Sequence, residues 1–177
     1  MRLFIALDLP AAARKALAAW AAQAAPAEVR PVPVDNLHVT LAFLGARSSD
    51  EAAAAGALLP ALARPLAQLR TTGALWLPPR RPGVLTVALE ADETLAALQA
   101  ELVSGLASAI GFEAERRRFR PHVTVGRVAR GTRIDTRRAF DPPAPALRFQ
   151  APALTLYRSR TAPDGARYER LSGVELA

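Results

Sequence analysis

The stretch Asn36-Leu37-His38-Val39-Thr40-Leu41-Ala42-Phe43-Leu44-Gly45 contains a tripeptide, His-Val-Thr, that returns at residues 122–124. The chain has only two histidines, His38 and His122, and each opens one copy of this tripeptide. Apolar and β-branched neighbours followed by glycine predict a strand around each copy. Side chains alternate along a strand, so each histidine is expected to share a face with the threonine two positions on, Thr40 or Thr124.

Both copies belong to a longer repeat. Hydrophobic patterning predicts strand, helix and strand twice, at 3–7, 11–25 and 38–44 and again at 84–90, 94–110 and 122–126. The histidines lie 84 positions apart (122 − 38), and the matching Ala6 and Ala88 lie 82 apart (88 − 6). Such a repeat predicts two pseudo-symmetric lobes, and a twofold axis between them would bring both histidines to one cleft.

The rest of the chain is expected to connect and close these two units. We predict a helix capped by residues 48–51 and ending near Ala63, a strand at 68–77, a stiff connector at 78–83, a surface loop at 141–145, and a hairpin of 155–159 and 167–171 around Pro163-Asp164-Gly165. The 177 residues suit one packed domain. We therefore expect a single domain over 1–177, with its motifs at 38–41 and 122–125.

The composition favours an anionic partner. The net charge is +7, and arginine supplies nearly all of the positive charge because Lys15 is the only lysine. A basic surface of this kind most often binds nucleic acid. A GC-rich genome would also raise the arginine content, so the positions of the arginines must decide between these two explanations.

Several classes of protein are disfavoured by the sequence. Although 51% of the residues are hydrophobic, no apolar run approaches the roughly 20 residues of a membrane span. The first ten residues do not resemble a signal peptide, so a cytoplasmic protein without a membrane partner is expected. With no cysteine there are no disulfides, and two histidines without cysteines or a carboxylate cluster make a poor zinc site. We expect no metal and no cofactor.

Two histidines with opposite roles suit displacement at phosphorus. A neutral imidazole can accept the proton of the attacking water while an imidazolium protonates the departing oxygen. Thr40 and Thr124 can donate hydrogen bonds to the non-bridging phosphate oxygens. The competing interpretations are a buried structural histidine and, for the threonines, plain β-propensity.

Arginines and aromatic residues near the second motif are candidates for substrate binding. Arg116, Arg117, Arg118 and Arg120 precede His122, and Arg127 follows its strand. Alternation predicts that Arg120 shares the face of His122, so we single out Arg120 and Arg127 as phosphate ligands, against a solvated basic surface. Phe43, Phe119, Tyr157 and Tyr168 could stack a base, although core packing competes for Phe43.

These residues resemble the two-histidine (2H) phosphoesterases, and more narrowly the bacterial RNA 2',3'-cyclic phosphodiesterases of the LigT-like branch, historically called 2'-5' RNA ligases. The resemblance covers nearly the whole chain and rests on the opening residues 2–7 and on the segments 36–45 and 119–127. It implies a bilobal α+β fold in which two antiparallel-rich sheets line a central cleft, with the helices outside.

The resemblance also implies metal-independent opening of RNA 2',3'-cyclic phosphate ends to 2'-phosphates. His38 would then be the proton donor and His122 the proton acceptor, with Thr40 and Thr124 holding the phosphate. Lysine is common in relatives near Ala42, so RNA affinity on that side is in question. Phe43, Arg120 and Arg127 are expected to bind the substrate, which is RNA with a 2',3'-cyclic phosphate end, and the protein is expected to be a monomer.

The residues by themselves leave several alternatives open. They distinguish neither donor from acceptor nor a cyclic from a linear phosphodiester. The reverse reaction, 2'-5' joining of RNA ends, shares the same transition state. A 2H enzyme acting on a small cyclic nucleotide or another oligonucleotide end, and a non-catalytic RNA-binding module, are the competing functions.

Overall fold

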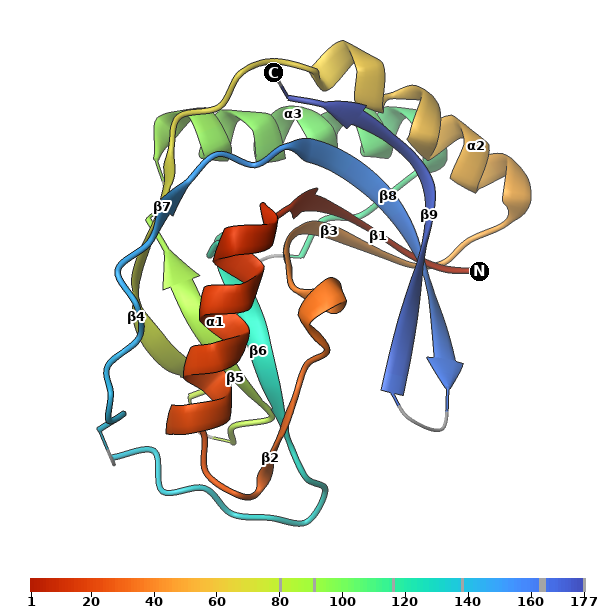
Figure 1. Ribbon diagram of the computed structural model, residues 1–177. Coiled ribbons are helices and arrows are strands. Elements are labelled where there is room, and N and C mark those ends of the chain that lie inside the picture. The colour runs from red at the N-terminus through yellow and green to blue at the C-terminus, as the bar shows by residue number, and fades with distance from the viewer. Residues whose placement is uncertain (80, 91, 116, 138, 163–164, 177) are drawn as a thin grey trace.

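A computed structural model describes residues 1–177 except 80, 91, 116, 138, 163–164 and 177 (Figure 1). Its elements are β1 (Arg2–Asp8), α1 (Ala11–Ala24), β2 (Val29–Pro31), β3 (His38–Ala46), α2 (Ser49–Ala57), β4 (Leu69–Leu77), β5 (Val84–Leu89), α3 (Glu93–Ile110), β6 (His122–Val128), β7 (Arg148–Phe149), β8 (Ala153–Ala162) and β9 (Gly165–Glu175). Short 3-10 helices occur at Val34–Asn36 and Leu59–Leu62.

The strands form an antiparallel sheet in the order β7-β4-β5-β6-β3-β1-β8-β9, and β2 pairs with the end of β6. β1 pairs with β3 in the first half as β5 pairs with β6 in the second, so the repeat in the sequence is a repeat in the fold. The α+β class and the two matching halves are confirmed. In place of two separate sheets, β3 and β6 join the halves edge to edge at the pair Val39–Val123.

Helices α1 and α3 each pack across the boundary between the two halves of the sheet. Helix α1 of the first half contacts β6, and α3 of the second half contacts β3 (Figure 1). Alternate residues of β1, namely Leu3, Ile5 and Leu7, point into the core beneath the helices. Phe4 and Asp8 therefore lie on the opposite side of the sheet. We call this side the open face.

The helix ends follow local signals. Ser48 and Glu51 form a capping box at the start of α2, and Gly111 adopts the left-handed conformation that ends α3. The prediction that the second helix continues to Ala63 is wrong, because α2 ends at Ala57 and a 3-10 turn follows. Pro60 lies in that turn, and a proline inside an α-helix lacks the N–H and clashes with the preceding turn.

The predicted strands are all present, and several run longer than predicted: β6 continues to Val128, β8 covers Ala153–Ala162 and β9 covers Gly165–Glu175. Strand β3 passes through Gly45, at a φ of 73°, and ends at Ala46. The hairpin predicted near the C-terminus is confirmed by the pairing of β8 with β9, while its turn residues Pro163 and Asp164 lie outside the described residues. None of the helices in the described ranges is long and apolar enough to cross a membrane.

Candidate active site

His38 and His122 begin two neighbouring strands on the open face. The antiparallel pair Val39–Val123 lies between them, so His38 lies beside Thr124 and Thr40 lies beside His122. Each imidazole Nδ1 lies 2.7 Å from the carbonyl oxygen two residues earlier, that of Asn36 or Arg120. A carbonyl only accepts hydrogen bonds, so Nδ1 carries the proton in both rings and donates it. Nε2 of each ring is left for chemistry.

A β-bulge follows each motif threonine. Thr40 pairs with Ala6 but Ala42 pairs with Ile5, and Thr124 pairs with Thr86 but Gly126 pairs with Leu85. Leu41 and Val125 are therefore the extra residues of the two bulges. Each is buried in the core, and so is the residue that follows it, Ala42 or Gly126. An extra residue reverses the alternation beyond it.

The bulges bring Phe43 and Arg127 onto the open face. Without them, strict alternation would point both side chains into the core. Phe43 is 64% exposed, so its interpretation as a core residue is wrong. Arg127 is exposed and lies opposite Val84, and its charge acts on His38. Both positions three residues after the motif threonines are thereby available to a ligand.

Arg120 reaches the site in a different way from the one predicted. β6 begins only at His122, so Arg120 lies in the preceding loop and shares no strand face with it. Its carbonyl oxygen orients the His122 ring, and its exposed side chain lines a pocket of about 300 Å³. Leu75, Leu77, Phe119 and His122 also line this pocket. Arg117 and Arg118 are exposed, and Arg116 lies outside the described residues.

His38 is enclosed by aromatic rings. The Phe4 ring stacks on it at 4.8 Å between centroids, and the Tyr168 ring meets it edge-on at 5.4 Å. The Tyr157 ring stacks on Phe4 at 5.3 Å and lies 6.5 Å from the His38 ring. Of the four aromatic candidates, Tyr157, Tyr168 and Phe43 gather around His38 and Phe4, while Phe119 lies beside His122. Sequence reasoning missed Phe4, because an aromatic residue in a buried strand is usually part of the core.

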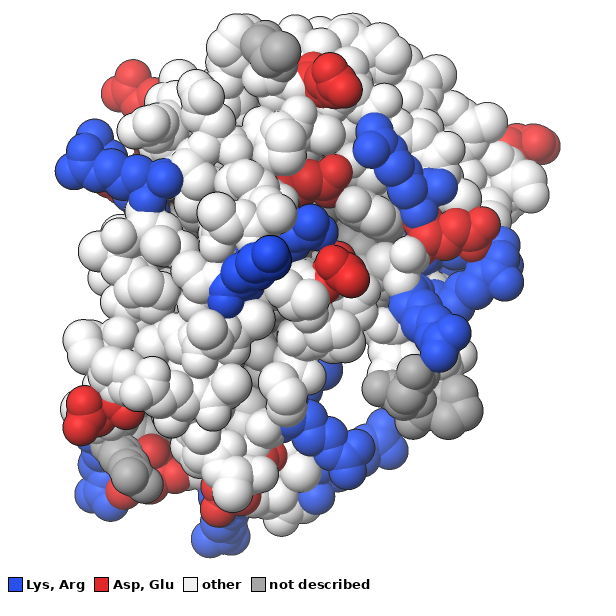
Figure 2. Space-filling model, in the orientation of Figure 1, with Lys and Arg blue, Asp and Glu red and all other residues white. Residues whose placement is uncertain are grey.

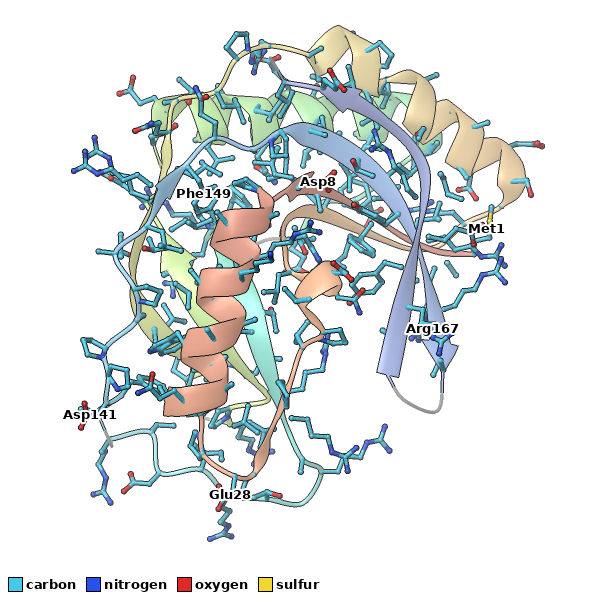
Figure 3. All side chains as sticks on the ribbon, viewed as in Figure 1. Met1, Asp8, Glu28, Asp141, Phe149 and Arg167 are labelled. Carbon is cyan, nitrogen blue, oxygen red and sulfur yellow. The ribbon has the colours of Figure 1, made fainter. Side chains whose placement is uncertain are left out.

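Asp8 is a second residue that sequence reasoning missed. It is the partner of His38 in the β1–β3 register, and its carboxylate accepts hydrogen bonds from Tyr157 Oη at 2.7 Å and Thr155 Oγ1 at 3.0 Å. Burial, together with the Asp8 carboxylate, raises the pKa of Tyr157 to about 12, so this phenol remains a donor. No sequence signal marks Asp8, because only the strand pairing brings it to His38. Figure 3 labels Asp8 at the end of β1.

The groups around His38 shift its pKa in opposite directions. Burial lowers its pKa below the ordinary value, while the Asn36 carbonyl and the Asp8 carboxylate raise it. The charges of Arg127 and His122 lower it further. Nε2 of His38 also lies 3.0 Å from Thr40 Oγ1. The site therefore combines two imidazoles, two hydroxyls and a guanidinium. No group of three or more histidine, cysteine or acidic side chains suited to a metal occurs in the described parts of the chain.

Comparison with known proteins identifies a family of similar sequences and structures. The 2'-5' RNA ligase superfamily matches residues 8–163. An RNA 2',3'-cyclic phosphodiesterase of Escherichia coli is 32% identical over 96% of this chain and 93% of its own length, and one of Thermus thermophilus is 34% identical over 99% and 90%. The structure of TT0787 of T. thermophilus covers 99% of this chain and 98% of its own at 31% identity, with a TM-score of 0.82. E. coli LigT complexed with 3'-AMP covers 99% and 97% at 32% identity, with a TM-score of 0.78.

Proposed function

The chain belongs to the 2'-5' RNA ligase superfamily, and we propose that it opens the 2',3'-cyclic phosphate at an RNA 3' end to leave a 2'-phosphomonoester. The observation that carries this proposal is the pair of imidazoles on adjoining strands, both with Nδ1 held by a backbone carbonyl. Their two Nε2 atoms can then exchange protons with a substrate held between them. The names of the full-length relatives support the choice of substrate.

His122 acts as the general base and His38 as the general acid. Nε2 of His122 takes a proton from water as the water oxygen bonds to phosphorus, and Nε2 of His38 gives a proton to O3' as the P–O3' bond breaks. Phe43 lies on β3 next to Phe4, which stacks on His38, and its exposed ring can stack the base of the nucleoside that keeps O3'. The lowered pKa of His38 also makes its imidazolium a stronger acid.

The remaining side chains hold the phosphate. Thr40 and Thr124 lie beside the two rings and can donate hydrogen bonds to the non-bridging oxygens as negative charge develops. Arg127 can bind the same phosphate through part of its guanidinium, whose five N–H donors leave others for a neighbouring phosphate. Arg120 lines the pocket beside His122, from which the nucleophile would enter.

The pocket beside His122 also supports 2'-5' joining as a second reaction. It lies on the side from which the nucleophile enters, and about 300 Å³ is at the lower end of the size range of small-molecule sites. A 5'-hydroxyl bound there would replace water, lose its proton to His122 and form a 2'-5' phosphodiester as P–O3' breaks. One P–O bond forms and one breaks, so no further reactant is needed.

We expect the wild-type protein to convert a synthetic oligoribonucleotide with a 2',3'-cyclic phosphate end to the 2'-phosphate in the presence of EDTA. His38→Ala and His122→Ala should each lower kcat by at least about 10²-fold, because each removes one proton transfer. Circular dichroism should show an unchanged fold. Chromatography against 2'- and 3'-phosphate standards, with a 5'-hydroxyl RNA added in a parallel reaction, identifies each product.

Other results would contradict the proposal. A 3'-phosphate product, or turnover only after a divalent metal is added, would exclude this mechanism. Tight RNA binding without turnover, unchanged by either histidine substitution, would indicate a binding module. Turnover of cyclic mononucleotides alone would place the chain among 2H enzymes that act on small cyclic nucleotides.

A further inference from the structure

The proposed reaction leaves one conspicuous arginine unused. Arg30 lies on β2 directly opposite Arg127 in the β2–β6 pairing, and both side chains are exposed. Residues directly opposite one another in an antiparallel pair have Cβ atoms about 5 Å apart, and like charges there are destabilising. In the described part of the chain, neither arginine forms an ion pair. A second such pair, Arg70 and Arg148, differs in that Glu90 lies 3.9 Å from Arg70.

The fold holds Arg30 in this position. The pairing of β2 is extended by hydrogen bonds from Val32 N to Val125 O and from Ala129 N to Glu28 O. Val29 is buried in the core, so its neighbour Arg30 points to the open face, as Arg127 does after the bulge. Gly126 permits this close packing, since a Cβ there would overlap the Val29 side chain. The two like charges are therefore built into the sheet.

The order of residues along β6 indicates which part of a substrate would meet this pair. His122 and its pocket lie at one end, Thr124 and the neighbouring His38 follow, and Arg127 with Arg30 lies beyond them. With the leaving O3' and its nucleoside bound beside His38, a substrate that follows this order along the sheet would place the 5' oxygen of that nucleoside toward Arg30. In RNA this oxygen carries the next phosphate. Figure 2 shows basic side chains beside the hollow between the β2–β6 end and the β8–β9 hairpin, where Figure 3 labels Arg167.

We propose that Arg30, together with Arg127, forms a second phosphate subsite that binds the phosphodiester on the 5' side of the nucleotide bearing the cyclic phosphate. This inference rests on the proposed function and extends it, because it makes the chain selective for RNA ends over nucleoside cyclic phosphates. A phosphate of RNA bound between the two guanidinium groups would supply a negative charge that compensates their mutual repulsion.

The test compares adenosine 2',3'-cyclic phosphate with the same compound carrying a 5'-phosphate. Arg30→Gln should lower kcat/KM for the 5'-phosphorylated compound about 10-fold and leave the other within about 2-fold, because a charged hydrogen bond contributes on that order. Arg148→Gln removes one arginine of the Arg70–Arg148 cross-strand pair and should change neither value. The dependence of oligoribonucleotide affinity on salt should also weaken in Arg30→Gln, by about 0.7 in the slope of log K against log salt.

Equal losses of kcat/KM for both compounds, or no loss for either, would overturn the subsite. Failure of the proposed function has a different signature, which is the absence of wild-type turnover with both compounds.

Calorimetry with adenosine 2'-phosphate, with and without a 5'-phosphate, then tests the subsite without turnover. The 5'-phosphate should tighten binding about 10-fold in the wild type and have little effect in Arg30→Gln, and an equal gain in both proteins would reject the subsite. Thermal unfolding checks that the variants fold.

Discussion

His38 and His122 make the same backbone hydrogen bond but lie in different surroundings. His38 is covered by Phe4 and Tyr168 and faces Asp8, whereas His122 opens onto a pocket. Two equivalent sequence motifs thus produce one enclosed imidazole and one accessible imidazole. This asymmetry suits an acid that protonates a bound oxygen and a base that receives a small nucleophile.

Asp8 should set the pH range of activity. His38 must be protonated to act as an acid, so activity falls as pH rises through its pKa. The Asp8 carboxylate raises that pKa against burial, Arg127 and His122. Asp8→Asn should therefore move the high-pH limb of the kcat/KM profile to lower pH. The measurement is a pH–rate profile with a cyclic-phosphate oligonucleotide.

Tyr157→Phe is the matched control for this prediction. It removes one donor to Asp8 but keeps the carboxylate, so the high-pH limb should not move to lower pH. If both substitutions lowered activity equally at every pH, the role of Asp8 would be structural rather than electrostatic.

At the scale of the element, the two bulges explain the spacing of the functional residues. In a regular strand, residues three apart point to opposite faces, so Thr40 and Phe43, or Thr124 and Arg127, could not share a ligand. One extra residue in each strand turns Phe43 and Arg127 onto the open face. Bulges are frequent beside active sites for this reason.

The close packing of β2 against β6 depends on Gly126. Gly126→Ala should destabilise the protein by about 1–3 kcal/mol, because the new Cβ overlaps the stiff side chain of Val29. Chemical denaturation measures this loss. Gly83→Ala is the control: its nearest contact would be the Leu77 carbonyl oxygen at 3.9 Å, so a change within about 0.5 kcal/mol is expected. Equal stabilities of the two variants would contradict the account of the β2–β6 packing.

At the scale of the whole molecule, the two histidines lie where the two halves meet. The described strands β3 and β6 pair only at Val39 and Val123, and both valines are fully buried. Helices α1 and α3 each pack across this boundary. The distance between the two imidazoles therefore depends on how the halves are joined.

Val39→Ala should accordingly lower activity more than an equally destabilising substitution elsewhere in the core. Removing two methyl groups from the junction should destabilise by about 1–3 kcal/mol and lower kcat/KM about 10-fold, since small shifts between catalytic groups are costly. Val87→Ala, which truncates a fully buried valine of β5, should cost similar stability with less effect on kcat/KM. Denaturation and kinetics on the same preparations compare the two. Equal kinetic losses would argue against a special role for the junction.

Much of the fold was predictable because its signals are local. Hydrophobic periodicity predicted α1 and α3, and alternation predicted the motif strands. The repeat predicted two matching halves and a shared position for His38 and His122. Local patterns failed for α2, which ended early, and for Arg120, whose loop does not continue the strand.

The sequence by itself singled out the side chains that we propose carry the chemistry, since two histidines in matching strands allow few other choices. Only the tertiary structure decided which residues surround them. Asp8 meets His38 through strand pairing, Phe4 stacks on it from β1, and Arg30 faces Arg127 from a strand about a hundred residues away in the chain. Bulges and register are set by packing between strands rather than by the propensity of any residue, so a single chain read in order does not reveal them.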